Sequence, residues 1–192
     1  TPLTDPHNDA LIKDFEAEQK LVYLNDVNFD SEGNPVVLAV VSNDFRPGPN
    51  GDPREWMLMH WKNGQWNFRT VCTSTHNYDM GSLYIEGKYW RIIGPTDAGP
   101  QQYGTGGEMV MWESSDDGKT WKKSKILTRN SARNHSYARR PLDAHDDFYA
   151  FWADGHADKF SESHLYFCNK KGVVRMLPYL MKNDVEKPVT LK

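Results

Sequence analysis

Cysteine is scarce in this chain of 192 residues, which contains only Cys72 and Cys168. Small secreted domains that depend on disulfides use several pairs, so a disulfide scaffold is excluded as the basis of the fold. The two residues are also far from the C-x-x-C spacing of zinc and thiol-redox motifs. Cysteine usage therefore leaves the redox compartment open.

Long apolar runs and blocks of like charge are missing as well. No run approaches the ~20 apolar residues of a membrane-spanning helix, and the N-terminal T-P-L-T-D-P lacks the charged-then-apolar pattern of a signal peptide. The formal net charge is only −3, which gives no electrostatic reason to expect nucleic acid or an anionic membrane as a partner. We therefore expect a processed chain or a segment of a longer protein, without a membrane span.

Aromatic residues are plentiful by contrast. They make up 12% of the chain and include seven tryptophans, on a background that is polar and contains many glycines. Large amphipathic rings of this kind suit either stacking against sugars or packing between the sheets of a propeller. The composition leaves these two roles open.

The hydrophobic pattern divides the chain into a lead-in segment, 1–20, and a β-rich region, 21–192. Within the lead-in, Leu11, Ile12 and Phe15 lie at mixed helical spacing, which predicts either a short helix or an irregular segment. From Leu21 onward the period is two, and strand-like runs are separated by turn sequences rich in Gly, Pro and Asn. The predicted strands are 22–29, 35–41, 55–61, 65–71, 81–86, 89–95, 108–113, 121–127, 137–142, 148–153, 163–168 and 173–179.

These runs form three similar units, at about 21–72, 81–128 and 136–180. A period of roughly 50 residues with four strands per unit is typical of β-propeller blades. The sequence therefore predicts an all-β fold with about three four-stranded antiparallel blades. Because rings need about 4–8 blades to remove their exposed edges, we expect the C-terminal part of a larger propeller, with association through open blade edges. A compact three-blade sandwich is the alternative.

One turn of the second unit carries a distinct motif. Ser114-x-Asp116-x-Gly118-x-Thr120-Trp121 resembles the Asp-box hairpin of sialidases and other propellers. Asp116 can accept hydrogen bonds from backbone N–H groups further along the turn, and Gly118 can adopt a positive φ. An ordinary Asp-Gly hairpin is the alternative interpretation. The motif indicates fold and says little about chemistry.

The blade order predicts which loops share a face. Loops after the second and fourth strands of a meander open on one side, and the Asp-box turn lies on the other. The first side collects the long loops and most of the unusual polar residues, as expected for a functional face. We predict that substrate contacts there come from Asn77, Tyr78, Asp97, Gln102, Asn134, Trp152, Asp154 and His156.

Four segments extend the resemblance to a family. H-N-Y-D-M-G-S-L-Y at 76–84, the segment 90–108, R-N-H-S-Y-A-R-R-P at 133–141 and F-Y-A-F-W-A-D-G-H at 148–156 resemble the BNR-4 repeat family. That family is similar to propeller polysaccharide lyases that cleave uronate-containing glycans such as ulvan. The resemblance implies a ring of about seven blades, an acidic polysaccharide or oligosaccharide as partner, and a secreted or periplasmic location.

Eliminative cleavage of a uronate needs a cation at the carboxylate, a base at C5 and an acid at the leaving oxygen. Arg139 and Arg140 are the candidate cations because a guanidinium binds a carboxylate bidentately, and Arg140 is slightly favoured. His76 and His135 are the candidate base or acid, because an imidazole titrates near neutral pH. The phenolic alternatives are Tyr78, Tyr103 and Tyr137.

Other charged and imidazole groups have simpler interpretations. Arg46 and Arg54 lie in a Pro/Gly-rich segment and are predicted to be turn or rim charges, and His60 and His145 are predicted to be structural. The predicted chemistry requires no cofactor.

A structural metal, zinc or calcium, is the alternative for the group His145, His156, His164 and Cys168. Their spacings match no compact zinc motif.

Two other function classes remain in play. A sialidase-like glycoside hydrolase would need three separated arginines, a Tyr nucleophile and a Glu partner, of which Glu108 is the nearest candidate. A glycan-binding propeller without catalysis would result if absent blades held the essential groups.

Overall fold

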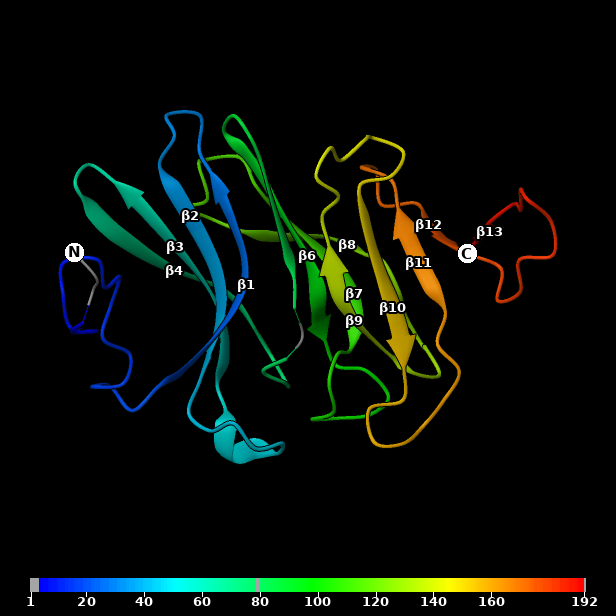
Figure 1. The fold of residues 1–192 in the computed structure, drawn as a ribbon, viewed down its shortest axis with the longest axis horizontal. Coiled ribbons are helices and arrows are strands. Elements are labelled where there is room, and N and C mark those ends of the chain that lie inside the picture. Colours follow the sequence, from blue (N-terminus) through cyan, green and yellow to red (C-terminus); the bar gives the residue numbers. More distant parts are fainter. Residues whose placement is uncertain (1–3, 79, 192) are drawn as a thin grey trace.

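The computed structural model describes residues 4–78 and 80–191, and it is an all-β fold. Three antiparallel sheets stand side by side along the chain (Figure 1). Apart from strands, the described residues form one short 3-10 helix, Pro49–Gly51. Within the same residues there is no helix long and apolar enough to cross a membrane. The predicted fold class is confirmed, and the three sheets are consistent with blades of a partial propeller.

The sheets are named here blade A, blade B and blade C. Blade A consists of β1 (Leu21–Phe29), β2 (Pro35–Ser42), β3 (Arg54–Lys62) and β4 (Gln65–Ser74). Blade B consists of β5 (Ser82–Glu86), β6 (Tyr89–Asp97), β7 (Glu108–Ser114) and β8 (Lys122–Ile126). Blade C consists of β9 (Asn134–Arg139), β10 (Ala150–Gly155), β11 (Leu165–Cys168), β12 (Val174–Met176) and β13 (Val189–Thr190).

Blade C differs from its prediction at several strands, and β12 is shorter than the predicted strand 173–179. Its fifth strand, β13, pairs with β12 at the outer edge and was not predicted, because two isolated residues carry no period. The predicted strand 137–142 begins earlier, at Asn134, where His135 exchanges backbone hydrogen bonds with Gly107 of blade B. It ends at Arg139 because Pro141 has no N–H to continue the ladder.

The lead-in segment contains turns and no helix, so the irregular alternative is the one observed. Ile12 and Phe15 pack against Val37, Ala39 and Met59 on the face of blade A that points away from blade B. The lead-in therefore covers the outer part of this face.

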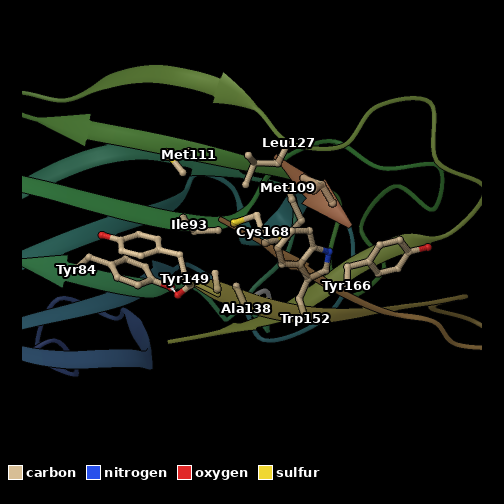
Figure 2. Close-up of a cluster of buried hydrophobic side chains, with 12 residues drawn as sticks. Tyr84, Ile93, Met109, Met111, Leu127, Ala138, Tyr149, Trp152, Tyr166 and Cys168 are labelled. Carbon is tan, nitrogen blue, oxygen red and sulfur yellow. Dashed lines mark hydrogen bonds between the residues drawn. The ribbon is translucent and has the colours of Figure 1, made fainter. Parts of the chain in front are cut away.

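Two apolar clusters join the blades. Between A and B, strand residues such as Val40 and Leu58 meet Leu83 and Ile92, with Trp56 and Trp90 buried among them. Figure 2 shows the cluster between B and C, where Tyr84 stacks on Tyr149 with ring centroids 4.1 Å apart. Burial of this surface holds neighbouring blades in a fixed relation.

The loops that join second to third strands lie at the lower side in Figure 1, and they span 43–53, 98–107 and 156–164. The links between blades, described at 75–78, 80–81 and 127–133, end there as well. We call this side the loop face. The turn at 115–121 lies at the other end of blade B, as its position between β7 and β8 requires.

That turn has side-chain-to-backbone hydrogen bonds of the kind that the sequence predicts for Asp116. The Asp116 carboxylate accepts from the Thr120 N–H at 2.9 Å and from the Thr120 hydroxyl at 2.7 Å. Ser114 Oγ donates to Asp116 at 2.7 Å and accepts from the Gly118 N–H. The hydrogen bonds from Thr120 lower the pKa of Asp116 to about 2. Gly118 has φ of +73°, and a Cβ there would also meet the Trp90 ring at 2.5 Å.

We predict that Asp116→Ala lowers the melting temperature at pH 7 and leaves glycan binding unchanged, because the turn lies away from the loop face. The folded pKa is depressed, so this stabilisation is present above the unfolded pKa of about 4 and is lost as pH falls toward 2. Thermal unfolding at pH 7 and pH 2.5 measures both effects. Asp117→Asn is the control; a loss of glycan binding with unchanged melting would reverse the assignment of faces.

The first strand of blade A, β1, has exposed apolar side chains on the face that the lead-in segment covers only in part. Leu24 is 57% exposed and Phe29 58% exposed. Leu24 pairs with Ala39 and Val27 pairs with Val37, which places this row on the same face as the lead-in contacts.

We predict that the isolated chain self-associates and binds an apolar dye, because an open blade face is an exposed apolar patch. The double variant Leu24→Ser/Phe29→Ser should reduce both signals, whereas Leu142→Ser, at a side chain 97% exposed on a loop, should not. Light scattering and dye fluorescence are the measurements. A compact, dye-free monomer for the unmodified chain would contradict the open-face interpretation.

Candidate functional site

The first group of polar residues lies on the loop face, where the link between blades A and B brings His76 beside Tyr78. The Tyr78 N–H donates to His76 Nδ1 at 3.0 Å, so the neutral ring carries its proton on Nε2. The two rings are 5.3 Å apart. Burial, together with the nearby Arg54 cation, lowers the pKa of His76 to about 4. The imidazole is therefore uncharged at neutral pH.

Tyr23, at the loop-face end of β1, completes this group and was not predicted. Its ring packs edge-on against Tyr78 with centroids 4.8 Å apart. Burial and the hydrogen bond with Tyr78 raise the pKa of Tyr23 to about 12. The phenol is therefore protonated at neutral pH. We call His76, Tyr78 and Tyr23 the His76 cluster.

Arg54 stands behind this cluster, and the prediction that it is a rim charge is wrong. Its side chain is fully buried, and Nε donates to Asn77 Oδ1 at 3.1 Å. Its other nitrogens donate to the Asp52 carboxylate and to backbone carbonyls of the loop 43–53. The guanidinium also lies over the Tyr103 ring, 5.7 Å from its centroid. Arg54 thus ties the loops of blades A and B together and fixes Asn77, which adjoins His76.

Asn134 performs a similar task for the loop 98–107. Its side chain donates to the carbonyls of Gln101 and Thr105 at 2.9 and 3.1 Å, and its Oδ1 accepts from the Gln101 N–H. Asn134 is 1% exposed. These bonds support the loop conformation in which Tyr103 has φ of +62°, an uncommon value for a non-glycine residue.

A second group lies between blades B and C and contains His135. Trp152 Nε1 donates to His135 Nδ1 at 3.0 Å, and His135 Nε2 lies 3.0 Å from Ser131 Oγ. Ser131 Oγ donates to the Glu108 carboxylate at 2.8 Å, so the imidazole is the donor to Ser131. Burial lowers the pKa of His135. The chain of hydrogen bonds fixes a neutral ring, 3% exposed, with both nitrogens engaged.

Asp154 organises the neighbouring wall of this group. Its carboxylate accepts from Arg133 Nε at 3.3 Å, from the Tyr166 hydroxyl at 3.0 Å and from the His164 N–H at 2.6 Å. Arg133 Nη2 also lies 2.7 Å from His164 Nδ1. These residues border a cavity of about 870 Å³ between blades B and C. Arg133 was missed, although its place just before Asn134 and His135 was the available signal.

The remaining predicted residues lie apart from these groups. Arg140 Nε is buried without a hydrogen-bond partner in the described chain and is 3.6 Å from the Asp26 carboxylate. Asp97 binds Lys123 at 2.5 Å on the side of blade B. Others are exposed or partly exposed on β9 or in loops: Gln102, Tyr137, Arg139 and His156.

The residues considered for a metal do not gather. No three His, Cys, Asp or Glu side chains within the described ranges form a set of metal ligands. Cys168 is buried in the core between blades B and C, and burial raises the pKa of its thiol to about 12. His145 and His156 bond to backbone N–H groups of their own turns, and His164 faces Arg133. His60 pairs with Asp30 at 2.9 Å.

Two solved structures share this arrangement of sheets. One is a PL25 ulvan lyase bound to a GlcA(1-4)Rha3S saccharide, with a TM-score of 0.60 and 15% sequence identity. The other is a PL25 ulvan lyase with a TM-score of 0.58 and 16% identity. Each match covers 79% of this chain and 33% of the other, so the chain spans a third of those structures. The sequence matches no protein-family model and no curated protein. At this identity the likeness establishes a shared fold.

We predict that His76 makes the chain less stable in acid. Its pKa in the unfolded state is about 6.5, so between pH 6.5 and its folded pKa of about 4 the unfolded chain binds the extra proton. Stability therefore falls as pH drops through this window. His76→Gln should reduce the difference in unfolding free energy between pH 7 and pH 5, measured with urea. His145→Gln, at an exposed turn, is the control, and an equal effect of both substitutions would contradict the assignment.

Proposed function

We propose that this chain is part of a BNR-4-type propeller that cleaves uronate-containing polysaccharides by β-elimination. The observation that carries the proposal is the His76 cluster, where an uncharged imidazole adjoins the phenols of Tyr78 and Tyr23 on the loop face. The shared fold with PL25 ulvan lyases supports the same reaction class. A secreted or periplasmic location, where such polymers are met, is part of the proposal.

The reaction needs matched protonation states. A base removes the proton from C5, the electron pair forms the C4=C5 double bond, and the C4–O bond breaks as an acid protonates the leaving oxygen. A neutral imidazole accepts a proton at its unprotonated nitrogen, which in His76 is Nδ1, so the hydrogen bond from the Tyr78 N–H must open before His76 can act as the base. A phenol that keeps its proton can donate one. With the pKa of His76 near 4 and that of Tyr23 near 12, both groups hold these states across the neutral range.

Within this scheme His76 is the proposed base and Tyr78 or Tyr23 the proposed acid. His135 is the second candidate base; its ring nitrogens are hydrogen-bonded to Trp152 and Ser131, as Nδ1 of His76 is to the Tyr78 N–H. Arg54 is excluded as the carboxylate clamp, since it is fully buried with its nitrogens bonded to Asn77, Asp52 and loop carbonyls. No metal or other cofactor is needed for these steps.

Arg140 remains the proposed clamp. Its Nε lacks a hydrogen-bond partner among the described residues, and its nearest carboxylate, Asp26, is 3.6 Å away. Because Nε is buried while the side chain as a whole is 26% exposed, a uronate carboxylate would have to bind the rest of the guanidinium. Charge that develops at C5 spreads toward the carboxylate, so this contact should strengthen in the transition state.

A non-catalytic glycan-binding propeller is the second candidate function. The observation that favours it is the burial of His76, which is 5% exposed. A base must come within hydrogen-bond distance of the proton that it removes. The two candidates differ in whether unsaturated products form. A sialidase-like hydrolase is less favoured, because Arg54 and Arg133 are both engaged by acidic and backbone groups of the protein.

We predict that Arg140→Ala lowers kcat far more than it raises KM on a uronate glycan. Arg140→Lys should recover only part of the rate, because a point charge lacks the bidentate geometry. His76→Ala should lower kcat by roughly 10²–10⁴-fold, the usual contribution of proton transfer. Initial rates followed by the ultraviolet absorbance of the unsaturated product are the measurement.

His145→Gln serves as the control for these assays, and the carboxyl-reduced glycan serves as the control substrate. Reducing-end assays run in parallel distinguish elimination from hydrolysis. The kcat/KM profile should be level between about pH 5.5 and 9 and decline toward pH 4, as His76 becomes protonated. Equal rates on the two glycans, or full activity of Arg140→Ala and Arg139→Ala, would exclude the lyase and leave the binding propeller.

A further inference from the structure

A groove between blades B and C carries a separate set of cationic side chains. Three adjoining hollows of about 870, 530 and 360 Å³ share Ile126 and Arg129 along their walls. Together they run from β12 and Leu191, past Arg129, to the loop segment 97–100. Volumes in this range are typical of ligand pockets. We call this continuous depression the basic groove.

The cations of the groove come from β8 and from the link between blades B and C. Lys123, Lys125 and Arg129 line its outer part, and Arg133 lines its deepest part. Lysines on an edge strand such as β8 have a general explanation, since they discourage pairing with another sheet. Arg129 and Arg133 lie beyond the end of that strand, so this explanation does not cover them.

Acidic side chains in the groove offset part of this charge, since Asp97 lines the groove and binds Lys123. Glu108 is buried and accepts hydrogen bonds from Thr128 and Ser131. Asp154 is bonded to Arg133 and the Tyr166 hydroxyl, which leaves Arg129 without a carboxylate partner among the described residues. Four cations and three carboxylates line the groove, so its formal charge is +1 on a chain whose net charge is −3, and Arg129 is a cation that no carboxylate of the described residues pairs.

The groove also contains hydrogen-bond donors next to apolar side chains. Arg133 uses Nε and Nη2 for Asp154 and His164, and its Nη1 has no bonding partner in the part of the chain described. His164 accepts at Nδ1, so its proton lies on Nε2, which can donate outward. Leu127 and Val174 form part of the apolar lining. Polar donors over an apolar surface suit a sugar ring that carries an anionic substituent.

We propose that the basic groove binds an anionic polysaccharide, through its sulfate or carboxylate groups, at a position separate from the His76 cluster. The groove lies between blades B and C, whereas the His76 cluster lies between A and B. Binding in the groove would hold a long polymer on the protein while another stretch reaches the loop face. The groove can be tested without any assumption about cleavage.

The test measures binding of an ulvan oligosaccharide, and of its desulfated and carboxyl-reduced forms, by calorimetry at low salt. Arg129→Gln should weaken binding about threefold to fivefold, the range for one exposed charge contact. Arg129→Glu should weaken it more than tenfold, because a like charge then opposes the ligand. Lys88→Gln, on the exposed turn between β5 and β6, is the matched control and should leave the affinity unchanged.

Arg129 is the residue chosen for substitution because its side chain is exposed, and replacing it leaves no buried group without a hydrogen-bond partner. Arg133→Gln would leave Asp154 short of its cation, so this variant is interpreted only if its melting temperature is unchanged. Wild-type affinity in both Arg129 variants, or equal binding of a single-stranded oligonucleotide of the same charge, would overturn the proposal. Loss of cleavage in His76→Ala with binding unchanged would support two separate sites.

The first outcome is that neither the unmodified chain nor any variant forms unsaturated product, while the Arg129 variants bind the glycan more weakly. In that case the groove proposal is supported and the lyase proposal fails. If product forms at the wild-type rate in Arg129→Glu and its affinity is also unchanged, the groove proposal fails and the lyase proposal stands.

Discussion

The close contact between one tryptophan and two glycines determines how blades A and B meet. A Cβ at Gly81 would lie 2.2 Å from the Trp56 ring, and a Cβ at Gly94 would lie 2.4 Å from it. The indole therefore lies directly on the backbone of blade B, at a spacing that only glycine permits. Gly81 ends the link that carries His76, so the same contact anchors the blade B end of that link. Because protein interiors are close-packed, a contact of this kind restricts the position of the neighbouring segments as well.

The packing between blades positions the ends of the loops on the loop face, and hydrogen bonds from buried side chains then fix the loops themselves. Arg54 holds Asn77 and the loop 43–53, while Asn134 holds the loop 98–107. Both side chains are buried and extensively hydrogen-bonded, and each connects segments from different blades. A loop that is fixed in this way can keep Tyr103 at a positive φ, which an unsupported loop would relax. Preorganised loops of this kind are what a binding or catalytic surface requires.

Much of the fold follows from local pattern, because alternation and turn chemistry act over a few residues. The strands of blades A and B and the turn at Asp116 belong to this class. Sequence reasoning failed where a side chain's role depends on distant segments. Arg54 reads as a rim charge in a Pro/Gly-rich stretch, yet its partner Asn77 belongs to the link to the next blade. Tyr23 reads as one aromatic in a strand, and only the packing of β1 beside that link brings it to Tyr78.

The protonation states of the candidate site follow from its position between blades. An imidazole at a junction is shielded from water, and shielding favours its neutral form, as at His76 and His135. Neutrality prepares His76 to accept a proton, and the same shift makes the fold lose stability as the solution becomes acidic. A more exposed His76 would keep an ordinary pKa and would be partly charged near pH 6, which would lower the fraction of the neutral imidazole that the proposed reaction needs. Burial at the junction therefore links the stability of the blades to the chemistry proposed for the loop face, and acid should impair both together.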